Sequence, residues 1–247
     1  MPSGENSLIL VVILIFLFSG IVKGFLGIGL PSAAMAFLTL IMEPTTAISL
    51  LTLPIIFTNF LQFTRCENPK QIATKYWLFA MAIMSSIFVT SFFILSYPKA
   101  LLTLAIGISM VLFSLTQIFD LRIKISDNHA WHLSIGLFAG ILGGLSSIWS
   151  PPVAMYLLAR NSSKSEFIGA TGFMFLAASL PLAAGLSLAG LLTTTTILKS
   201  LVGLVAVLLG FRVGEIIQEI VPQDVFRKVV LWAFLIMGVR LISIGLF

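Results

Sequence analysis

Long apolar runs, separated by short polar stretches, follow one another along most of the chain. Since an apolar helix of about 20 residues crosses a hydrocarbon layer of roughly 30 Å, most of these runs predict membrane-spanning helices. Two of them, 31–42 and 152–159, would rise only about 18 Å and 12 Å, so neither spans by itself. The apolar segments are residues 8–25, 31–42, 46–64, 76–96, 98–119, 132–148, 152–159, 167–189, 194–211 and 226–246. The pattern predicts an all-α integral membrane protein with about ten hydrophobic segments.

The composition agrees with a chain that lies in lipid. Of 247 residues, 59% are hydrophobic and 9% are charged, whereas a soluble domain carries about 25% charged residues. A separate soluble domain is therefore excluded, and we expect one transmembrane domain over residues 1–247. The net charge of +5 reflects lysines and arginines in loops, so no nucleic acid partner is expected. The single cysteine, Cys66, excludes an internal disulfide.

The positive charges predict the orientation. If each short segment turns the chain back to the side it came from, Lys99 and Lys199 lie on one face, and the other face carries Arg65, Lys70, Lys75, Arg122, Lys124, Arg160, Lys164, Arg212, Arg227 and Lys228. If each short segment instead completes one crossing with its predecessor, the same residues divide six to six, which the positive-inside rule disfavours. We therefore predict that the strongly basic face is cytoplasmic and that both termini are extracytoplasmic.

Glycines at matching intervals indicate an internal duplication. A triplet of glycines with the form G-x3-G-x2-G recurs 116 residues later, as Gly20, Gly24, Gly27 and then Gly136, Gly140, Gly143. Pro98 and Pro222, each opening the last segment of its half, repeat at a similar offset of 124 residues. Five segments per half is an odd number, so the halves would insert in opposite orientations, as two inverted repeats, 8–119 and 132–246, joined by a cytoplasmic linker, 120–131. The alternative is that the small residues only allow close helix packing.

Lys23 is the most informative polar residue. It lies well inside the first apolar run, where a charge costs about 2.5 to 3.5 kcal/mol on insertion scales. Every Asp and Glu falls in a loop or at a segment end, so no carboxylate within a span neutralises it. A cation without a built-in partner predicts a diffusible anion. The alternative is that Lys23 extends to the lipid headgroups.

The residues beside Lys23 predict a break in the helix. Glycines can unwind it, and a half-helix that restarts at a proline presents unpaired N–H groups and its positive dipole end. The first break would use Gly24, Gly27, Gly29 and Pro31, and the second Gly140, Gly143, Gly144, Ser146, Ser147, Ser150 and Pro151, whose serines add hydroxyl donors. Each break would open its repeat as a discontinuous helix pair, and both would meet at a site near the membrane midplane.

Other polar residues are weaker candidates. Asn59 follows Pro54 in its helix and could face the substrate or bond a neighbouring helix. His129 and His132 could bind a metal, or lie in a solvated linker. No nucleophile with a nearby base and no phosphate-binding loop is present, so we expect neither an enzyme nor a cofactor.

The two glycine-rich stretches resemble a known family. They read LFSGIVKGFLGIGLP and GLFAGILGGLSSIWSPP, and the ending from LLGFRVGEII to VFRKVVLWAFLIMGVRLI completes the likeness. These motifs are similar to those of the TauE/SafE family of sulfite exporters and related anion permeases. The resemblance implies a duplicated fold and transport of small oxyanions or organosulfonates across the bacterial inner membrane. Leu30 and the stretch Ser146 to Trp149 depart from the usual pattern, and this leaves the ligand open.

Together these features predict a secondary transporter. It would export small sulfur-containing or organic anions, such as sulfite or sulfonates, by alternating access at a midplane site between the two repeats. A non-transporting membrane scaffold or assembly factor, and an anion channel, are the alternatives. Neither the anion nor the oligomeric state follows from the sequence.

Overall fold

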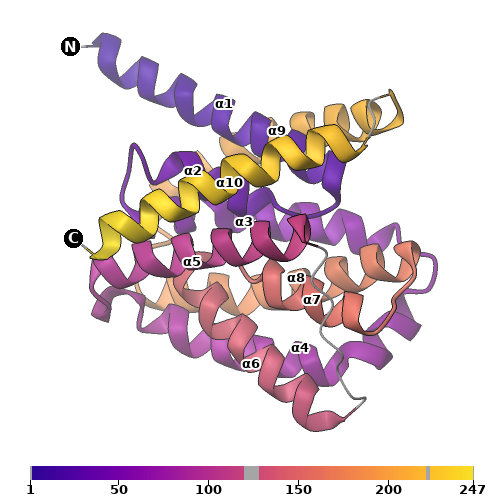
Figure 1. The fold of residues 1–247 in the computed structure, drawn as a ribbon. Helices are drawn as coiled ribbons and strands as arrows, with labels where there is room; N and C mark the ends of the chain where they lie inside the picture. Colours follow the sequence, from indigo (N-terminus) through magenta and orange to yellow (C-terminus); the bar gives the residue numbers. More distant parts are fainter. Residues whose placement is uncertain (1, 120–127, 221–222, 247) are drawn as a thin grey trace.

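The computed structural model describes residues 2–119, 128–220 and 223–246, of which 2–6 and 223–226 are described by their backbone alone. This part of the chain consists of helices joined by short connections and contains no strand (Figure 1). Its helices are α1 (Pro2–Leu26), α2 (Leu30–Leu38), α3 (Pro44–Thr64), α4 (Pro69–Phe92), α5 (Lys99–Ile118), α6 (His129–Ser146), α7 (Ser150–Ala159), α8 (Lys164–Leu188), α9 (Thr194–Ile220) and α10 (Gln223–Leu246), with a 3-10 turn η1 (Ile94–Ser96) after α4.

The prediction of an all-α membrane protein is confirmed, and the segments correspond one to one with the ten helices. Within the described residues, seven helices are long and apolar enough to cross a membrane, namely α1, α3, α4, α5, α8, α9 and α10. The 18-residue α6 and the short helices α2 and α7 are not among them. The number of helices is therefore larger than the number of candidate spans. The predicted linker residues 120–127 and Pro222 lie outside the described residues.

Prolines define several helix starts. Proline is the first residue of α3 and of α4, where its missing N–H has no helical partner to lose. Pro54 instead lies inside α3 and leaves the carbonyl of Leu50 without its usual donor. The Ser200 hydroxyl of α9 donates to that carbonyl at 2.7 Å. A hydrogen bond between helices thus replaces the one that proline removed.

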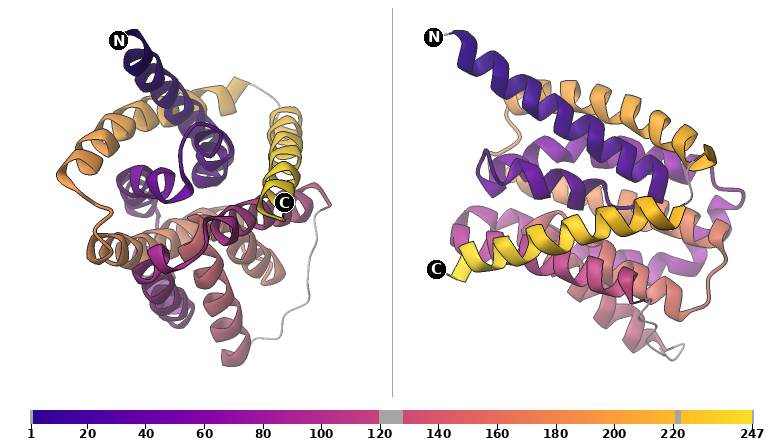
Figure 2. Two further views of the ribbon diagram at one scale, coloured as in Figure 1. Left: turned by 90° about the vertical axis from the view of Figure 1, so that its left-hand side faces the viewer. Right: turned by 45° about the horizontal axis from the view of Figure 1, so that its top comes forward.

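The long helices pack in pairs: α1 with α9, α4 with α6, α5 with α10, and α3 with α8 (Figure 2). Glycines make the first pair close. A Cβ atom on Gly210 would lie 2.0 Å from the carbonyl oxygen of Leu17, and one on Gly24 would lie 2.1 Å from that of Phe211. Small residues that let backbones approach are the usual basis of helix association in lipid, where the hydrophobic effect contributes little.

The same device holds α6 against α4. A Cβ atom on Gly140 would lie 1.8 Å from the Ser86 hydroxyl, and one on Gly144 would lie 1.7 Å from that of Thr90. Gly24, Gly140 and Gly144 therefore all contact a neighbouring helix, and the packing role that the sequence left open applies to each of them.

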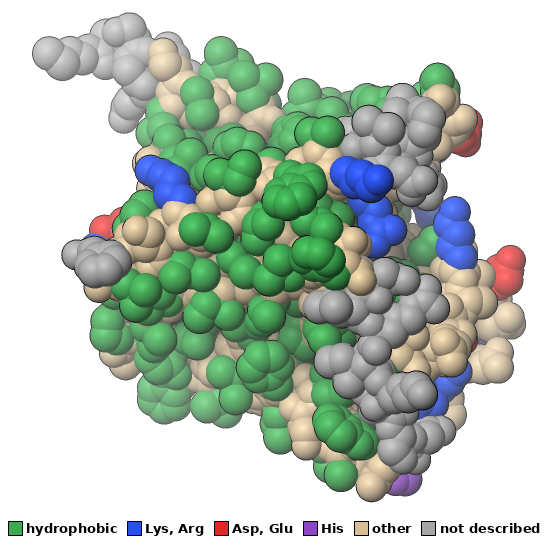
Figure 3. Space-filling view, viewed as in Figure 1, with side chains coloured by type: hydrophobic (Ala, Val, Ile, Leu, Met, Phe, Trp, Pro, Cys, Tyr) green, Lys and Arg blue, Asp and Glu red, His purple; other side chains and the backbone are tan. Residues whose placement is uncertain are grey.

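Charged contacts divide between the two ends of the bundle. Arg65 pairs with Glu215 at 2.6 Å, Lys75 pairs with Glu166, and the opposite end carries the Lys99–Glu43 pair. Between the ends the surface is broadly apolar, and most of the basic side chains visible in Figure 3 lie toward its right-hand edge.

We predict that Gly210→Ala destabilises the protein by at least about 2 kcal/mol, because a methyl group would force the backbones of α1 and α9 apart. Gly190→Ala is the matched control. A Cβ there meets nothing within 4 Å, although its φ of +77° is left-handed, so the cost should be only about 1 kcal/mol. Thermal unfolding in detergent compares the two. Equal losses would show that the close approach of α1 and α9 is not needed for stability.

Candidate functional site

The first helix break lies between α1 and α2. Gly27 and Gly29 have φ angles of 75° and 96°, which are left-handed values that favour glycine. The Gly27 N–H donates to the carbonyl of Lys23 at 2.7 Å and closes the last turn of α1. The chain restarts at Leu30, with Pro31 in the first turn of α2. Gly24 itself stays helical, so the break uses only the later glycines.

The second break, between α6 and α7, falls at a different register. Gly140, Gly143 and Gly144 all remain in α6, and the left-handed residue is Ser147, with φ 60°. Trp149, which is buried, lies against Gly143 and makes an edge contact with Phe175 of α8, their rings 6.0 Å apart. A non-glycine residue in this conformation carries strain of the kind often found at functional sites.

Helix α5 brings the two breaks together. The Ser109 hydroxyl of α5 lies 3.2 Å from the Ser146 hydroxyl at the end of α6. A Cβ atom on Gly29 would lie 3.8 Å from the ring of Phe113, also on α5. Four helical residues rise about 6 Å, so both breaks touch one short stretch of the same helix.

Lys23 lies inside the protein rather than at its surface. Its side chain is only 2% exposed, so the alternative that it extends to the lipid headgroups does not hold. The ammonium group donates to Oδ1 of Asn59, and Nδ2 of Asn59 donates to the carbonyl of Ile55 at 2.8 Å. An ammonium has three donors, and Asn59 supplies its one hydrogen-bonding partner among the described residues. Of the two alternatives for Asn59, the structure shows a bond to a neighbouring helix, because its amide oxygen accepts from Lys23 of α1.

Three buried hydroxyls at the breaks have no hydrogen-bond partner among the described residues. They belong to Ser32, Ser147 and Ser150, which are exposed by 0%, 0% and 2%. Ser146 differs, because its hydroxyl donates to the carbonyl of Leu142 at 2.6 Å and accepts from the N–H of Ile148 at 3.0 Å. Ser146 therefore shapes the break. Ser32 was not identified from the sequence, although its place just after Pro31 in a half-helix was the available signal.

The two half-helices offer different donors at their N-termini. In α2, the Ala33 N–H bonds back to Gly29 at 2.9 Å, which leaves the N–H groups of the first turn outside the helical pattern. In α7 the second and third residues are Pro151 and Pro152, which have no N–H. In its first turn, α2 therefore keeps the N–H groups of Leu30 and Ser32, whereas α7 loses two N–H groups to these prolines. At α7, hydroxyls are the main donors.

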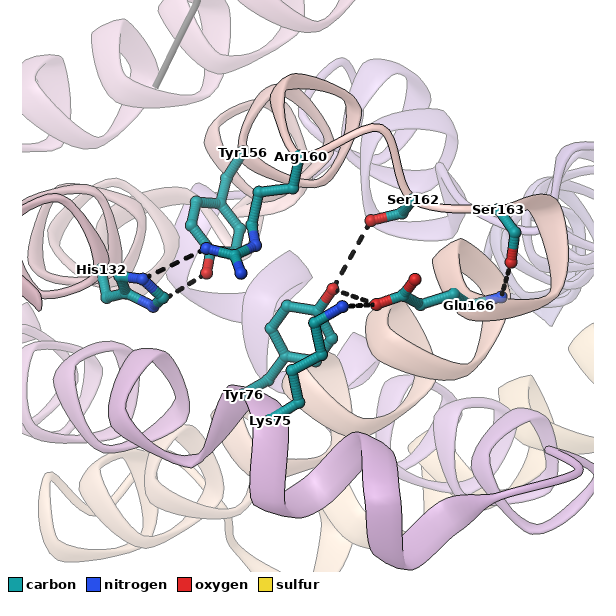
Figure 4. A network of polar contacts seen from close by, with 8 residues as sticks. All are labelled: Lys75, Tyr76, His132, Tyr156, Arg160, Ser162, Ser163 and Glu166. Atoms are coloured by element: carbon teal, nitrogen blue, oxygen red, sulfur yellow. Dashed lines mark hydrogen bonds and ion pairs between the residues drawn. The ribbon is translucent and has the colours of Figure 1, made fainter. Parts of the chain in front are cut away.

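A second polar cluster lies at the strongly basic end of the bundle (Figure 4). His132 of α6 places Nδ1 at 2.9 Å from the Tyr156 hydroxyl and Nε2 at 3.3 Å from Arg160. Nearby, the Tyr76 hydroxyl donates to Glu166 at 2.7 Å. Because these residues come from α4, α6, α7 and α8, the cluster anchors the C-terminal end of α7. The described residues contain no group of three metal-ligating side chains, and His132 belongs to a helix rather than to a linker.

A polar cavity of about 240 Å³ opens beside this cluster. Its lining includes Cys66 from the α3–α4 connection and Lys75 and Glu166 from the cluster. The Cys66 side chain is partly exposed. The cavity lies at the basic end, away from the two helix breaks, and it gives the single thiol access to solvent.

The fold and the paired helix breaks define a multi-pass helical membrane protein with polar groups held deep in its interior. A family model described as "Sulfite exporter TauE/SafE" matches residues 12–241, which is nearly the whole chain. The protein belongs to this family of membrane transporters, as the glycine-rich stretches had indicated. No curated protein and no solved structure matches the chain.

We predict that Asn59→Leu destabilises the protein by about 2 kcal/mol or more, because it leaves a buried ammonium without an acceptor. The double variant Lys23→Met/Asn59→Leu should recover most of that loss, since it removes both polar groups. Thermal unfolding of the wild type, the two single variants and the double variant measures this coupling. A double variant that loses the sum of the two single effects would contradict it.

Proposed function

We propose that the protein is a secondary transporter that exports small anions, such as sulfite or sulfonates. One observation carries this proposal: the buried ammonium of Lys23 has Asn59 as its sole hydrogen-bonding partner among the described residues, beside the break between α1 and α2. A charge inside the membrane region is expensive and is usually paired or part of a pathway. A diffusible anion would supply the missing partner.

The surroundings of Lys23 suit an anion on electrostatic grounds. A unit charge about 4 Å from an ammonium gains about 4 kcal/mol at an effective dielectric of 20. The N-terminus of α2 adds its dipole, and the hydroxyls of Ser147 and Ser150 add neutral donors from the second break. In this proposal the substrate lies between the two breaks. Lys23, Gly27, Gly29, Pro31, Ser147, Ser150 and Pro151 line or shape its site, while Gly24, Asn59, Gly140, Gly143, Gly144 and Ser146 support it.

We infer two inverted repeats from the helix pairing. If each helix is exchanged with the one five places along, the α1–α9 pair becomes α6–α4, and the α3–α9 contact becomes α8–α4; the α5–α10 and α3–α8 pairs exchange with themselves. This exchange supports a pseudo-two-fold axis relating the halves. Carriers built in this way alternate access by moving one repeat against the other around a fixed site.

The membrane potential is sufficient to drive export. With the cell interior negative, each monovalent anion that leaves gains about 2.3 kcal/mol per 100 mV. Among the described residues, the carboxylates Glu166 and Glu215 pair with basic side chains at an end of the bundle. A proton relay through buried carboxylates is therefore not required by this mechanism. The substrate moves as an anion, down its electrical gradient.

We predict that Lys23→Met abolishes anion-induced stabilisation, because the variant cannot compensate a buried negative charge. A ligand at 100 times its Kd stabilises the folded state by about 2.7 kcal/mol, which is visible as a raised Tm of the purified protein in sulfite. Lys199→Met, at an exposed position, is the control and should respond like the wild type.

The same variants test transport in proteoliposomes. The wild type and Lys199→Met should show saturable sulfite efflux with countertransport, and Lys23→Met should not. Efflux without saturation would indicate a channel. A wild type that neither binds nor moves anions would support a scaffold, and so would unchanged binding by Lys23→Met.

We further propose that the basic end of the bundle faces the cytoplasm and that both termini are outside the cell membrane. The single thiol tests this. In intact cells, a membrane-impermeant maleimide should leave Cys66 unlabelled until the membrane is permeabilised. Thr195→Cys in a Cys66→Ser background lies at the opposite end and should be labelled at once. The reverse pattern would invert the orientation.

A further inference from the structure

The unpartnered hydroxyls at the two breaks differ from other buried serines. Ser49 of α3, for example, is 1% exposed, and its hydroxyl donates to the carbonyl of Thr45 at 2.8 Å. Ser114 of α5 likewise donates to Met110 at 2.9 Å. Serine in a helix normally satisfies its hydroxyl in this way, with a carbonyl one turn earlier. Ser32, Ser147 and Ser150 have no such bond within the described part of the chain.

A buried hydroxyl without a partner lowers the stability of the folded protein. An alanine at any of these positions would avoid that cost and fill nearly the same space. All three hydroxyls flank the N-terminus of a half-helix, and those half-helices have 9 and 10 residues. The three unpartnered groups therefore lie where a ligand would be bound. This is the arrangement expected of a site in which the ligand supplies the hydrogen-bond acceptors.

The sequence of α7 strengthens this argument. Its prolines at positions 151 and 152 remove two of the N–H groups that an anion would otherwise meet at a helix start. The Ser150 and Ser147 hydroxyls replace them as neutral donors. On the α2 side, the Ser32 hydroxyl adds a donor to the backbone N–H groups. Within the described part of the chain, Lys23 supplies the charge at these breaks, and the neutral hydroxyls add hydrogen bonds of defined direction.

We propose that the hydroxyls of Ser32, Ser147 and Ser150 bind the oxygen atoms of the substrate and select an oxyanion over a halide of equal charge. This rests on the proposed anion transport. The Lys23 ammonium attracts any monovalent anion, whereas several hydroxyls can each bond a separate oxygen of a sulfonate. A halide also accepts several hydrogen bonds, but they must all converge on one atom, so hydroxyls directed at separate oxygens cannot all reach it.

The test compares two monovalent anions, methanesulfonate and bromide, by titration of the purified full chain. The wild type should prefer methanesulfonate. The preference is the Kd for bromide divided by the Kd for methanesulfonate. Ser32→Ala and Ser150→Ala should each lower this ratio by about tenfold, since each variant loses a hydrogen bond to the charged methanesulfonate. Their Tm without ligand should be unchanged or higher, because an unsatisfied group has been removed.

Ser49→Ala is the matched control, since its hydroxyl is equally buried but bonded. It should lower the Tm without ligand and leave the anion preference unchanged. If Ser32 and Ser150 had only a structural role, their alanine variants should also show a lower Tm without ligand and an unchanged anion preference. Ser32→Cys provides a second variant of similar size with a weak donor, and it should also lose the preference.

The outcomes separate this inference from the proposed function. Anion binding that requires Lys23 but keeps its methanesulfonate preference in Ser32→Ala and Ser150→Ala would overturn the role of the hydroxyls alone. A wild type that binds neither anion would overturn both. Loss of preference with an unchanged or raised Tm would establish the hydroxyls as determinants of specificity.

Discussion

The cost of leaving a polar group unpaired in an apolar environment governs this structure. In the helices the backbone satisfies itself, and where Pro54 interrupts the pattern, Ser200 of another helix takes over the free carbonyl. Both helix breaks contact α5, and Ile28, Ile148 and Trp149 within them are buried, so this irregular backbone does not face lipid. Among the buried side chains that the structure describes, only the Lys23 ammonium, the three hydroxyls and one amide atom each of Gln62 and Gln117 keep unused hydrogen-bonding capacity. Each retains bonding capacity in a place where that capacity is expensive.

Glycine serves two separate purposes in the chain. At Gly27 and Gly29 it permits left-handed backbone and ends α1, whereas at Gly24, Gly140 and Gly210 it lets two helices approach until backbone meets backbone or a short side chain. The first purpose forms the break between α1 and α2, and the second allows neighbouring helices to pack closely. The sequence motif does not distinguish glycines that break a helix from glycines that pack against one, because the two kinds lie within one turn of each other, as Gly24 and Gly27 do.

Because glycine has these two roles, the sequence predicts the helices better than it predicts where they break. Hydropathy identified all ten helices, since length and apolarity decide what lies in lipid. The exact place of the second break did not follow, because Gly143 and Gly144 stay helical and Ser147 takes the left-handed conformation instead. The bond between Lys23 and Asn59 depends on how α1 meets α3, and the sequence contains no signal for that contact. Ser32 was overlooked because its place just after Pro31 does not by itself indicate that its hydroxyl is buried without a partner.

Helix α5 contacts both breaks through Ser109 and Phe113 and also pairs along its length with α10. Because Ser109 and Phe113 lie one turn apart, a shift of α5 at this level would alter its contacts with both breaks at once.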